Sequence, residues 1–288
     1  MLISLNAIKR YVKIPDSVSE KELVKLIGSR LVEVESTESL AEKYQNIYIA
    51  KVVTCTDIPG THLHLCEIDA ENLNRQFGTL ENGFIQVVCG APNVRAGILV
   101  AWLAPGAIVP STFGTENLKL SVRKLRGFES YGMIAGLDEL GFGNEHKYIA
   151  EITPGLAEPG SDFSKVFGLN DLIIDIENKS LTHRPDTFGV IGFAREVAGI
   201  LGQPFENPLV YKGDFISQVQ DFSDSPNGQP IIEVESVELC PRYSCVILEQ
   251  ANLRKEPASD PSDNRPLTND AISLYKAGMR PISQIVDA

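Results

Sequence analysis

The feature that most constrains the fold is a series of short apolar stretches between about residues 44 and 152. They are separated by Gly, Pro and Asn, and include IYIAKVVTC, HLHLCEID, FIQVVCG and ILVAWLAPGAIVP. Many short strands at such spacing are typical of a small barrel or sandwich. LKLSVRKLRG predicts a further strand, and ESYGMIAGLDELGF predicts a turn and a short helix. We therefore predict a β-rich domain over residues 41–152.

The segments on either side of this region predict mixed α/β structure. Ser19 and Glu22 form a capping-box pattern before an apolar helical face, and LVEVE then indicates a strand. Beyond the β-rich region, DLIIDIENKS indicates a strand, and Asp186 is a natural N-cap for the helix in RPDTFGVIGFAREVAGILG. Because about 40 residues rarely form a core alone, we expect residues 1–40 and 153–205 to form one discontinuous domain.

The remaining residues predict a linker followed by the beginning of another domain. Residues 206–230 are polar and rich in Pro and Gly. IIEVESVELCPRYSCVILE then resumes strand-like alternation, and AISLYKAGMRPISQIVDA predicts a helix and a strand. We assign residues 231–288 to an incomplete α/β domain, because the sequence stops where a strand has just begun.

Composition restricts the kind of partner that the chain can bind. A net charge of −12 is unusual for a protein that holds nucleic acid by bulk charge, so an RNA contact needs a local basic patch or a partner subunit. Five cysteines without a CxxC pair predict neither a disulfide framework nor a four-cysteine zinc site. The sequence has no signal-peptide layout and no apolar run near ~18 residues, which favours the cytoplasm and no membrane contact.

A basic run in the β-rich region is the candidate nucleic-acid contact. Lys119, Arg123, Lys124 and Arg126 lie within eight residues that contain no acid. A barrel with one basic edge can hold a phosphate backbone, but a strand edge that charge protects from aggregation would have the same composition. On a strand, Lys119 and Arg123 would share one face and Lys124 and Arg126 the other, so we expect two or three phosphate contacts.

No catalytic or metal site is predicted. His62, His64 and Cys66 would share one face of a strand, but no fourth ligand lies nearby, so we interpret them as two surface imidazoles and a packed thiol. The sequence also lacks a GxxxxGK[ST] loop, HExxH and GxSxG. We therefore expect that no cofactor binds this chain.

Four blocks of sequence carry a resemblance to one family. VCGAPNVRAG (88–97) and KLRGFESYGM (124–133) are similar to the paired signature of tRNA-binding barrels. SLTHRPDTFGVIGFAREVAGILG (180–202), and CPRYS (240–244) with AGMRPISQIVD (277–287), follow in the family's order. The chain as a whole resembles the front portion of the β subunit of bacterial phenylalanine–tRNA ligase.

The resemblance implies an α+β multidomain fold. An oligonucleotide-binding β-barrel is inserted into a discontinuous α/β domain and is followed by the start of an α/β editing domain. It places Asn93 and Arg95 on the nucleic-acid side of the barrel, although their Gly-Ala-Pro-Asn turn would serve equally as a structural hairpin. It also places Arg242, Tyr243 and Ser244 at the border of the editing pocket.

The resemblance further implies partners and an activity. The family's enzyme is an α2β2 tetramer that uses ATP and Mg²⁺ to attach phenylalanine to its tRNA, with the aminoacylation site on the α subunit. The β subunit scaffolds α, binds tRNA and hydrolyses mischarged tyrosyl-tRNA, because an apolar pocket discriminates poorly against an added hydroxyl. We expect this chain alone to be inactive in both reactions.

Departures from the family pattern leave other functions open. Thr61-His62-Leu63 stands where the barrels usually have Asp-Lys-Leu, a polar insertion occupies about 253–270, and the family's Thr-Asn pair would follow Ala288. We therefore expect a truncated ligase subunit. One alternative is a non-catalytic tRNA-binding protein that assists another enzyme. A second is a structural subunit fragment whose barrel binds nothing strongly.

Overall fold

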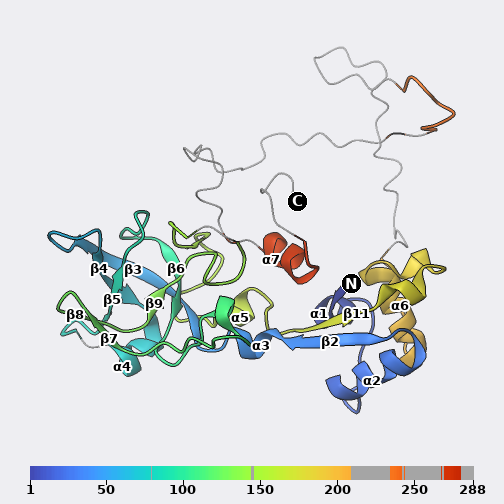
Figure 1. Cartoon of the computed structure of the whole chain (residues 1–288), viewed down its shortest axis with the longest axis horizontal. Helices are drawn as coiled ribbons and strands as arrows, with labels where there is room; N and C mark the ends of the chain where they lie inside the picture. The colour runs from blue at the N-terminus through green and yellow to red at the C-terminus, as the bar shows by residue number, and fades with distance from the viewer. Residues whose placement is uncertain are drawn as a thin grey trace. The chain divides into compact units, whose positions relative to one another are not determined.

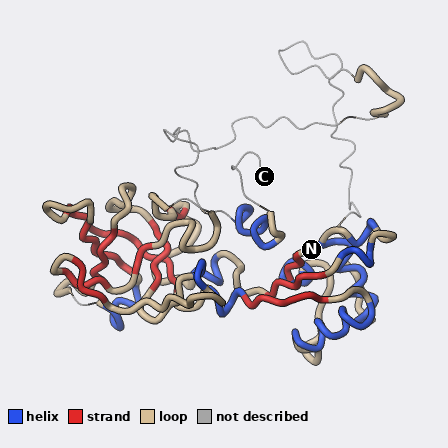
Figure 2. Tube along the Cα trace, viewed as in Figure 1, coloured by secondary structure: helices blue, strands red, loops and turns tan. Residues whose placement is uncertain are grey.

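The computed structural model describes residues 1–78, 80–143, 146–208, 234–241, 243, 267 and 269–279. The chain divides into two compact units, Met1–Phe205 with Pro257–Ala288, and Glu206–Glu256. All of the helices and strands described belong to the first unit (Figures 1 and 2). In the second unit, the described residues include a turn in which the amides of Leu239 and Cys240 donate to the carbonyl of Ser236.

A six-stranded antiparallel sheet forms a nearly closed barrel, as the sequence predicts for the β-rich region. Its strands run in the order β10-β6-β3-β4-β5, and β9 also pairs with β6. Their bounds are β3 Ile47–Asp57, β4 His64–Asp69, β5 Ile85–Cys89, β6 Leu99–Leu103, β9 Met133–Ile134 and β10 Glu151–Ile152. Short helical turns lie between them at η1 Glu71–Leu73, α4 Asn74–Phe77 and η2 Pro110–Thr112.

The long strand β3 has two partners because it changes register part-way along. Ile47–Lys51 pair with β6, whereas Lys51–Asp57 pair with β4, and the β4 register shifts between Val52 and Thr54. Such a bulge bends a strand and increases its twist, which helps a sheet to close. Trp102 fills the barrel interior, fully buried, and its indole N–H donates to the Tyr131 carbonyl at 2.8 Å.

A separate three-stranded antiparallel sheet joins distant parts of the chain in the order β1-β11-β2. These strands are β1 Leu2–Ser4, β11 Leu172–Ile176 and β2 Val34–Ser39. The helices α1 Leu5–Lys9, α2 Glu20–Arg30 and α6 Val190–Leu201 share a hydrophobic core with it. The turns η3 Asn178–Leu181 and η4 Pro185–Thr187 lead from β11 to α6. The domain boundaries that the sequence suggests stay predictions.

The predicted helix caps have different outcomes. Ser19 Oγ accepts the N–H of Glu22 at 3.2 Å, so this predicted cap is confirmed. Asp186 does not cap α6, because the helix begins after Gly189 and Asp186 lies in the preceding η4 turn. A side chain at Gly192 would meet the Asp186 carbonyl oxygen at 1.6 Å. The turn therefore packs directly against the helix backbone, which displaces Asp186 from the capping position.

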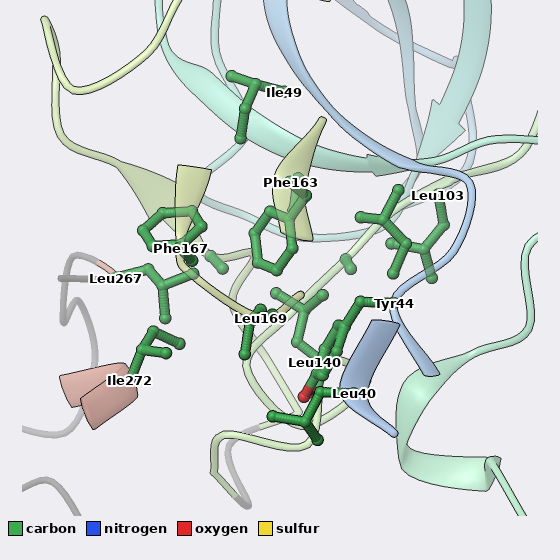
Figure 3. Close-up of a cluster of buried hydrophobic side chains, with 14 of the residues drawn as sticks. Leu40, Tyr44, Ile49, Leu103, Leu140, Phe163, Phe167, Leu169, Leu267 and Ile272 are labelled. Carbon is green, nitrogen blue, oxygen red and sulfur yellow. The ribbon is translucent and has the colours of Figure 1, made fainter. Parts of the chain in front are cut away.

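A second core cluster joins the barrel to three short helices (Figure 3). The helices are α3 Leu40–Lys43, α5 Phe163–Val166 and α7 Asn269–Lys276. The Tyr44 hydroxyl donates to the Leu140 carbonyl at 2.8 Å, and the Tyr44 ring stacks on Phe142. Phe142 in turn receives the edge of Tyr275 from α7. Helix α7 therefore contributes to the same core as residues near 44 and 140.

The short helix predicted within residues 129–142 is wrong. This segment instead contains the end of β8 (Phe128–Ser130), β9 and a series of turns. Met133 and Ile134 pair with β6, and Gly136 forms a bridge with Ile149, which leaves only turns between Leu137 and Gly141. Gly132 and Gly141, on either side, have φ of 82° and 81°. In the part of the chain that the structure describes, no helix is long and apolar enough to cross a membrane.

Candidate nucleic-acid interface

The basic run lies largely on a two-stranded hairpin that projects from the barrel. β7 Arg123–Leu125 pairs with β8, with Arg123 opposite Ser130 and Leu125 opposite Phe128. Arg126 and Gly127 form the turn with φ of 51° and 96°. Two left-handed residues are what the tightest hairpin turns require, and Gly readily supplies one of them. The turn therefore presents the Arg126 side chain at the exposed tip of the hairpin.

Strand β5 holds the hairpin in place through side-chain and main-chain hydrogen bonds. Gln86 Nε2 donates to the Glu129 carbonyl at 2.8 Å, and the main-chain carbonyl of Gln86 accepts the Tyr131 N–H at 2.9 Å. The buried Ser130 hydroxyl accepts the Val88 N–H at 3.0 Å and donates to the Gly132 carbonyl at 3.1 Å. These bonds fix the hairpin against the barrel wall although the two form separate sheets.

The two faces of the hairpin differ in chemistry. Arg123 and Leu125 point to one side and line a cavity, whereas Lys124 alternates to the other side, opposite Glu129. Lys119 lies before β7 and makes only an isolated bridge with Ile108. The sequence predicted one strand over residues 118–127. The structure instead has the short strand Arg123–Leu125 and, before it, the isolated bridge at Lys119. All four side chains of the basic run are exposed, and only Arg123 faces the cavity.

The cavity has a volume of about 460 Å³ and is open to solvent. The hairpin, the turn at Gly90 and the segment from His146 to Ile149 enclose it. Arg123, His146 and Lys147 supply basic groups, and Tyr148 supplies an aromatic ring that Lys147 Nζ approaches to 4.8 Å from the centroid. The remaining walls are mainly apolar, from Leu63, Val88, Leu120, Leu125, Met133, Ile134 and Ile149.

Two neighbouring carboxyl groups lie near this cavity. Glu139 lines it and accepts the N–H of Gly136, while Asp138 Oδ2 lies 2.6 Å from His146 Nδ1. Burial raises the pKa of Glu139, and the nearby Asp138 carboxyl raises it further, against the opposing effect of the Gly136 N–H. Glu139 therefore adds one carboxyl group to a cavity whose lining also includes the basic side chains of Arg123, His146 and Lys147.

Asn93 and Arg95 contribute to a structural network. The Asn93 amide donates to the Ile149 carbonyl at 3.1 Å and accepts the Ile149 N–H at 3.0 Å. Arg95 binds Glu151 through two nitrogens, at 2.8 and 3.0 Å, and only 4% of the Glu151 side chain is exposed. Both residues therefore connect the Gly90 turn to β10. Their predicted tRNA contacts stay predictions.

The suspected metal ligands are arranged as ordinary packing residues. His64 Nδ1 lies 2.8 Å from Asp57 Oδ1, and the buried Cys66 Sγ lies 3.8 Å from Cys55 Sγ. Burial raises the pKa of the Cys66 thiol and raises that of Cys89 to about 11. Among the described residues, no group of three His, Cys, Asp or Glu side chains has the geometry to hold a metal ion.

The predicted border of the editing pocket is only partly visible. Tyr243 is exposed, and Arg242 and Ser244 lie outside the described residues, as does nearly all of the insertion near 253–270. Sequence reasoning missed the groups that complete the cavity, namely Glu139, His146, Lys147 and Tyr148. The basic-aromatic triplet His-Lys-Tyr at 146–148 is a signal that could have indicated them.

Comparisons with known proteins agree with this architecture. Residues 47–162 match the family model described as "Putative tRNA binding domain". The whole chain aligns with phenylalanine–tRNA ligase β subunits, at 34% identity for Oceanobacillus iheyensis, 33% for Desulfotalea psychrophila and 32% for Streptococcus agalactiae. It covers 32%, 31% and 32% of those proteins, respectively, so it spans about a third of their length. This chain is therefore similar over its whole length to phenylalanine–tRNA ligase β subunits, and its residues 47–162 match the family of putative tRNA-binding domains.

Proposed function

We propose that this chain is the tRNA-binding part of a phenylalanine–tRNA ligase β subunit, within an enzyme that attaches phenylalanine to its tRNA with ATP. The observation that carries the proposal is the tRNA-binding match over residues 47–162, within a whole-chain match to β subunits. The exposed basic run on this barrel supplies the local positive charge that a chain of net charge −12 needs for RNA.

In this proposal the chemistry of aminoacylation belongs to a partner. An α subunit in an α2β2 assembly in the cytoplasm carries the aminoacylation site and uses ATP and Mg²⁺, while this chain scaffolds it. The lack of a nucleotide-binding motif in the sequence supports this division. The purified chain should then show no phenylalanine-dependent ATP–pyrophosphate exchange. Exchange above the no-enzyme rate would contradict the assignment of this site to α.

Editing is the second activity in the proposal. A complete β subunit would hydrolyse tyrosyl-tRNA in a pocket bordered by Arg242, Tyr243 and Ser244, and this chain spans about a third of the length of the β subunits it matches. The 288-residue chain should therefore leave tyrosyl-tRNA intact. Rapid deacylation by the purified chain would mean that the pocket is complete within these residues.

The tRNA-binding proposal is tested by changing the basic run. Replacement of its four residues by Ala should weaken tRNA binding by the full chain by about tenfold or more near 0.1 M salt, because phosphate contacts are lost. A matched control removes four exposed lysines elsewhere: Lys13, Lys21, Lys25 and Lys165. Both variants change the net charge equally, so equal affinities would show that the basic run is only a solvated edge.

A tRNA-binding module for another enzyme is the second candidate, because the match to the tRNA-binding domain model covers only residues 47–162. Co-purification with a phenylalanine–tRNA ligase α subunit separates the two proposals. A stable complex supports the ligase subunit. Tight tRNA binding without any association with α would favour the independent module.

A further inference from the structure

The cavity beside the β7–β8 hairpin shares Arg123 with the basic run, but the function proposed above gives it no ligand of its own. We infer that it holds one unstacked nucleotide of a bound RNA, with the base inside and the phosphate on Arg123 at the mouth. This inference rests on the proposed tRNA binding and specifies which part of the RNA the barrel binds. The nucleotide comes from a single-stranded loop or end, since a base inside a duplex is not available to enter a cavity.

The size and walls of the cavity suit a nucleobase. Its volume of about 460 Å³ falls within the range of about 300–1,000 Å³ in which proteins hold small ligands. Val88, Met133 and Ile134 supply apolar surface, and Tyr148 supplies an aromatic ring. Proteins bind single-stranded bases by placing their flat faces against such rings and apolar side chains.

The charged side chains of the cavity determine where the phosphate and the base of a bound nucleotide lie. Among the residues that the structure describes, the Arg123 guanidinium has no hydrogen-bond or ion-pair partner, and its planar fork matches a phosphate. Glu139 is the carboxylic acid that lines the cavity. Its carboxyl group does not attract a phosphate, but it can accept a hydrogen bond from the amino group of a base. The nucleotide therefore binds with its base inside the cavity and its phosphate at Arg123, and bases that carry an amino group are favoured.

Hydrogen bonds hold the walls of the cavity where the ligand would contact it. Ser130 and Gln86 tie the hairpin to β5, which fixes the position of the backbone at Arg123. Asn93 ties the Gly90 turn to Ile149, and both Gly90 and Ile149 line the cavity. A site whose walls are fixed before binding loses less conformational entropy on binding.

The test fills the cavity without disturbing the barrel core. Ser121 is exposed and lines the cavity, whereas the adjacent Val122 is exposed and does not. Ser121→Trp should weaken tRNA binding by the full chain by about tenfold, the loss expected for one stacked base. Val122→Trp, the matched control, should bind tRNA as the parent does. Circular dichroism and unfolding midpoints should confirm that both variants are folded.

A blunt-ended RNA duplex and single-stranded hexanucleotides complete the experiment. The duplex should bind Ser121→Trp and the parent equally, and oligo(A) and oligo(C) should bind the parent more tightly than oligo(U). Glu139→Gln should reduce that preference. Equal tRNA affinities for Ser121→Trp and Val122→Trp would overturn the inference, and the proposed tRNA binding would still stand.

If neither the parent nor any variant binds tRNA, the proposed function itself is wrong.

Discussion

Lys276 Nζ lies 2.7 Å from Asp171 Oδ2, and the Asp171 side chain has no exposed surface. The same carboxylate accepts the Ser4 hydroxyl at 2.5 Å and the Asn6 N–H at 2.9 Å. One buried acid therefore holds together the end of β1, the beginning of α1, the start of β11 and the last turn of α7. Lys276 also donates to the Gly168 carbonyl at 2.9 Å.

Removal of this lysine should destabilise the whole first unit. Lys276→Met keeps the apolar stem but leaves Asp171 buried with two donors in place of three, so we expect a loss of about 2–3 kcal/mol in the free energy of unfolding. Lys25→Met, on an exposed face of α2, is the control and should change it by less than about 0.5 kcal/mol. Urea denaturation measures both. Equal midpoints would mean that α7 is not held by this ion pair.

The chain offers a matched pair of left-handed glycines. Gly132 has φ of 82°, and a Cβ there would lie 2.0 Å from the Leu103 carbonyl oxygen, whereas Gly97 has φ of 92° and open space. Gly97→Ala should cost about 1–2 kcal/mol from backbone strain alone. Gly132→Ala adds a collision with the β6 backbone and should cost at least twice as much or prevent folding. Thermal unfolding of the two variants gives the comparison, and equal losses would refute the close approach.

Burial of Glu139 predicts a specific pH dependence. Because the folded state raises its pKa above the ordinary 4.5, the folded state binds this proton more tightly than the unfolded state does. The resulting stability is complete below pH 4.5 and is lost as the pH rises through the raised pKa. Glu139→Gln should therefore gain stability relative to the parent between pH 4 and pH 8. The exposed Glu116→Gln corrects for net charge, and parallel curves for both variants would contradict the prediction.

The two faces of the hairpin predict different salt dependence of tRNA binding. Arg123→Ala should remove a phosphate contact and make the log–log salt slope shallower by roughly 0.7 to 0.9. Lys124→Ala, on the face opposite the cavity and across from Glu129, should leave the slope nearly unchanged. The two variants carry the same charge change. A larger effect from Lys124 would place the RNA on the opposite face of the hairpin.

Sequence reasoning predicted features that depend on near neighbours. The apolar alternation in Ile47–Asp57 and the Gly and Pro between short runs predicted the barrel, and Ser19 with Glu22 predicted the start of α2. In each case the signal lies within a few residues of the feature. The short helix predicted within residues 129–142 was the exception. Nothing in the local sequence showed that Gly132 and Gly141 adopt positive φ in turns.

The candidate site was harder to predict because it depends on pairing between distant residues. Arg95 meets Glu151 only when the Gly90 turn comes to lie against β10, so its ion pair has no local signature. Glu139 and His146 face the same cavity because Gly136 forms a bridge with Ile149. The basic run was found from composition, but only the register of β7 with β8 shows that Arg123 and Lys124 face opposite ways.

The central position of β11 between β1 and β2 affects the order in which the chain folds during synthesis. Both outer strands, Leu2–Ser4 and Val34–Ser39, remain without their ladder partner until Leu172–Ile176 has been made. At about 5–20 residues per second, the ribosome needs on the order of ten seconds for the intervening residues. All strands of the barrel are synthesised during that interval, so they emerge from the ribosome before β11 does. The barrel can therefore form before this sheet does. Until β11 emerges, β1 and β2 have no strand to pair with.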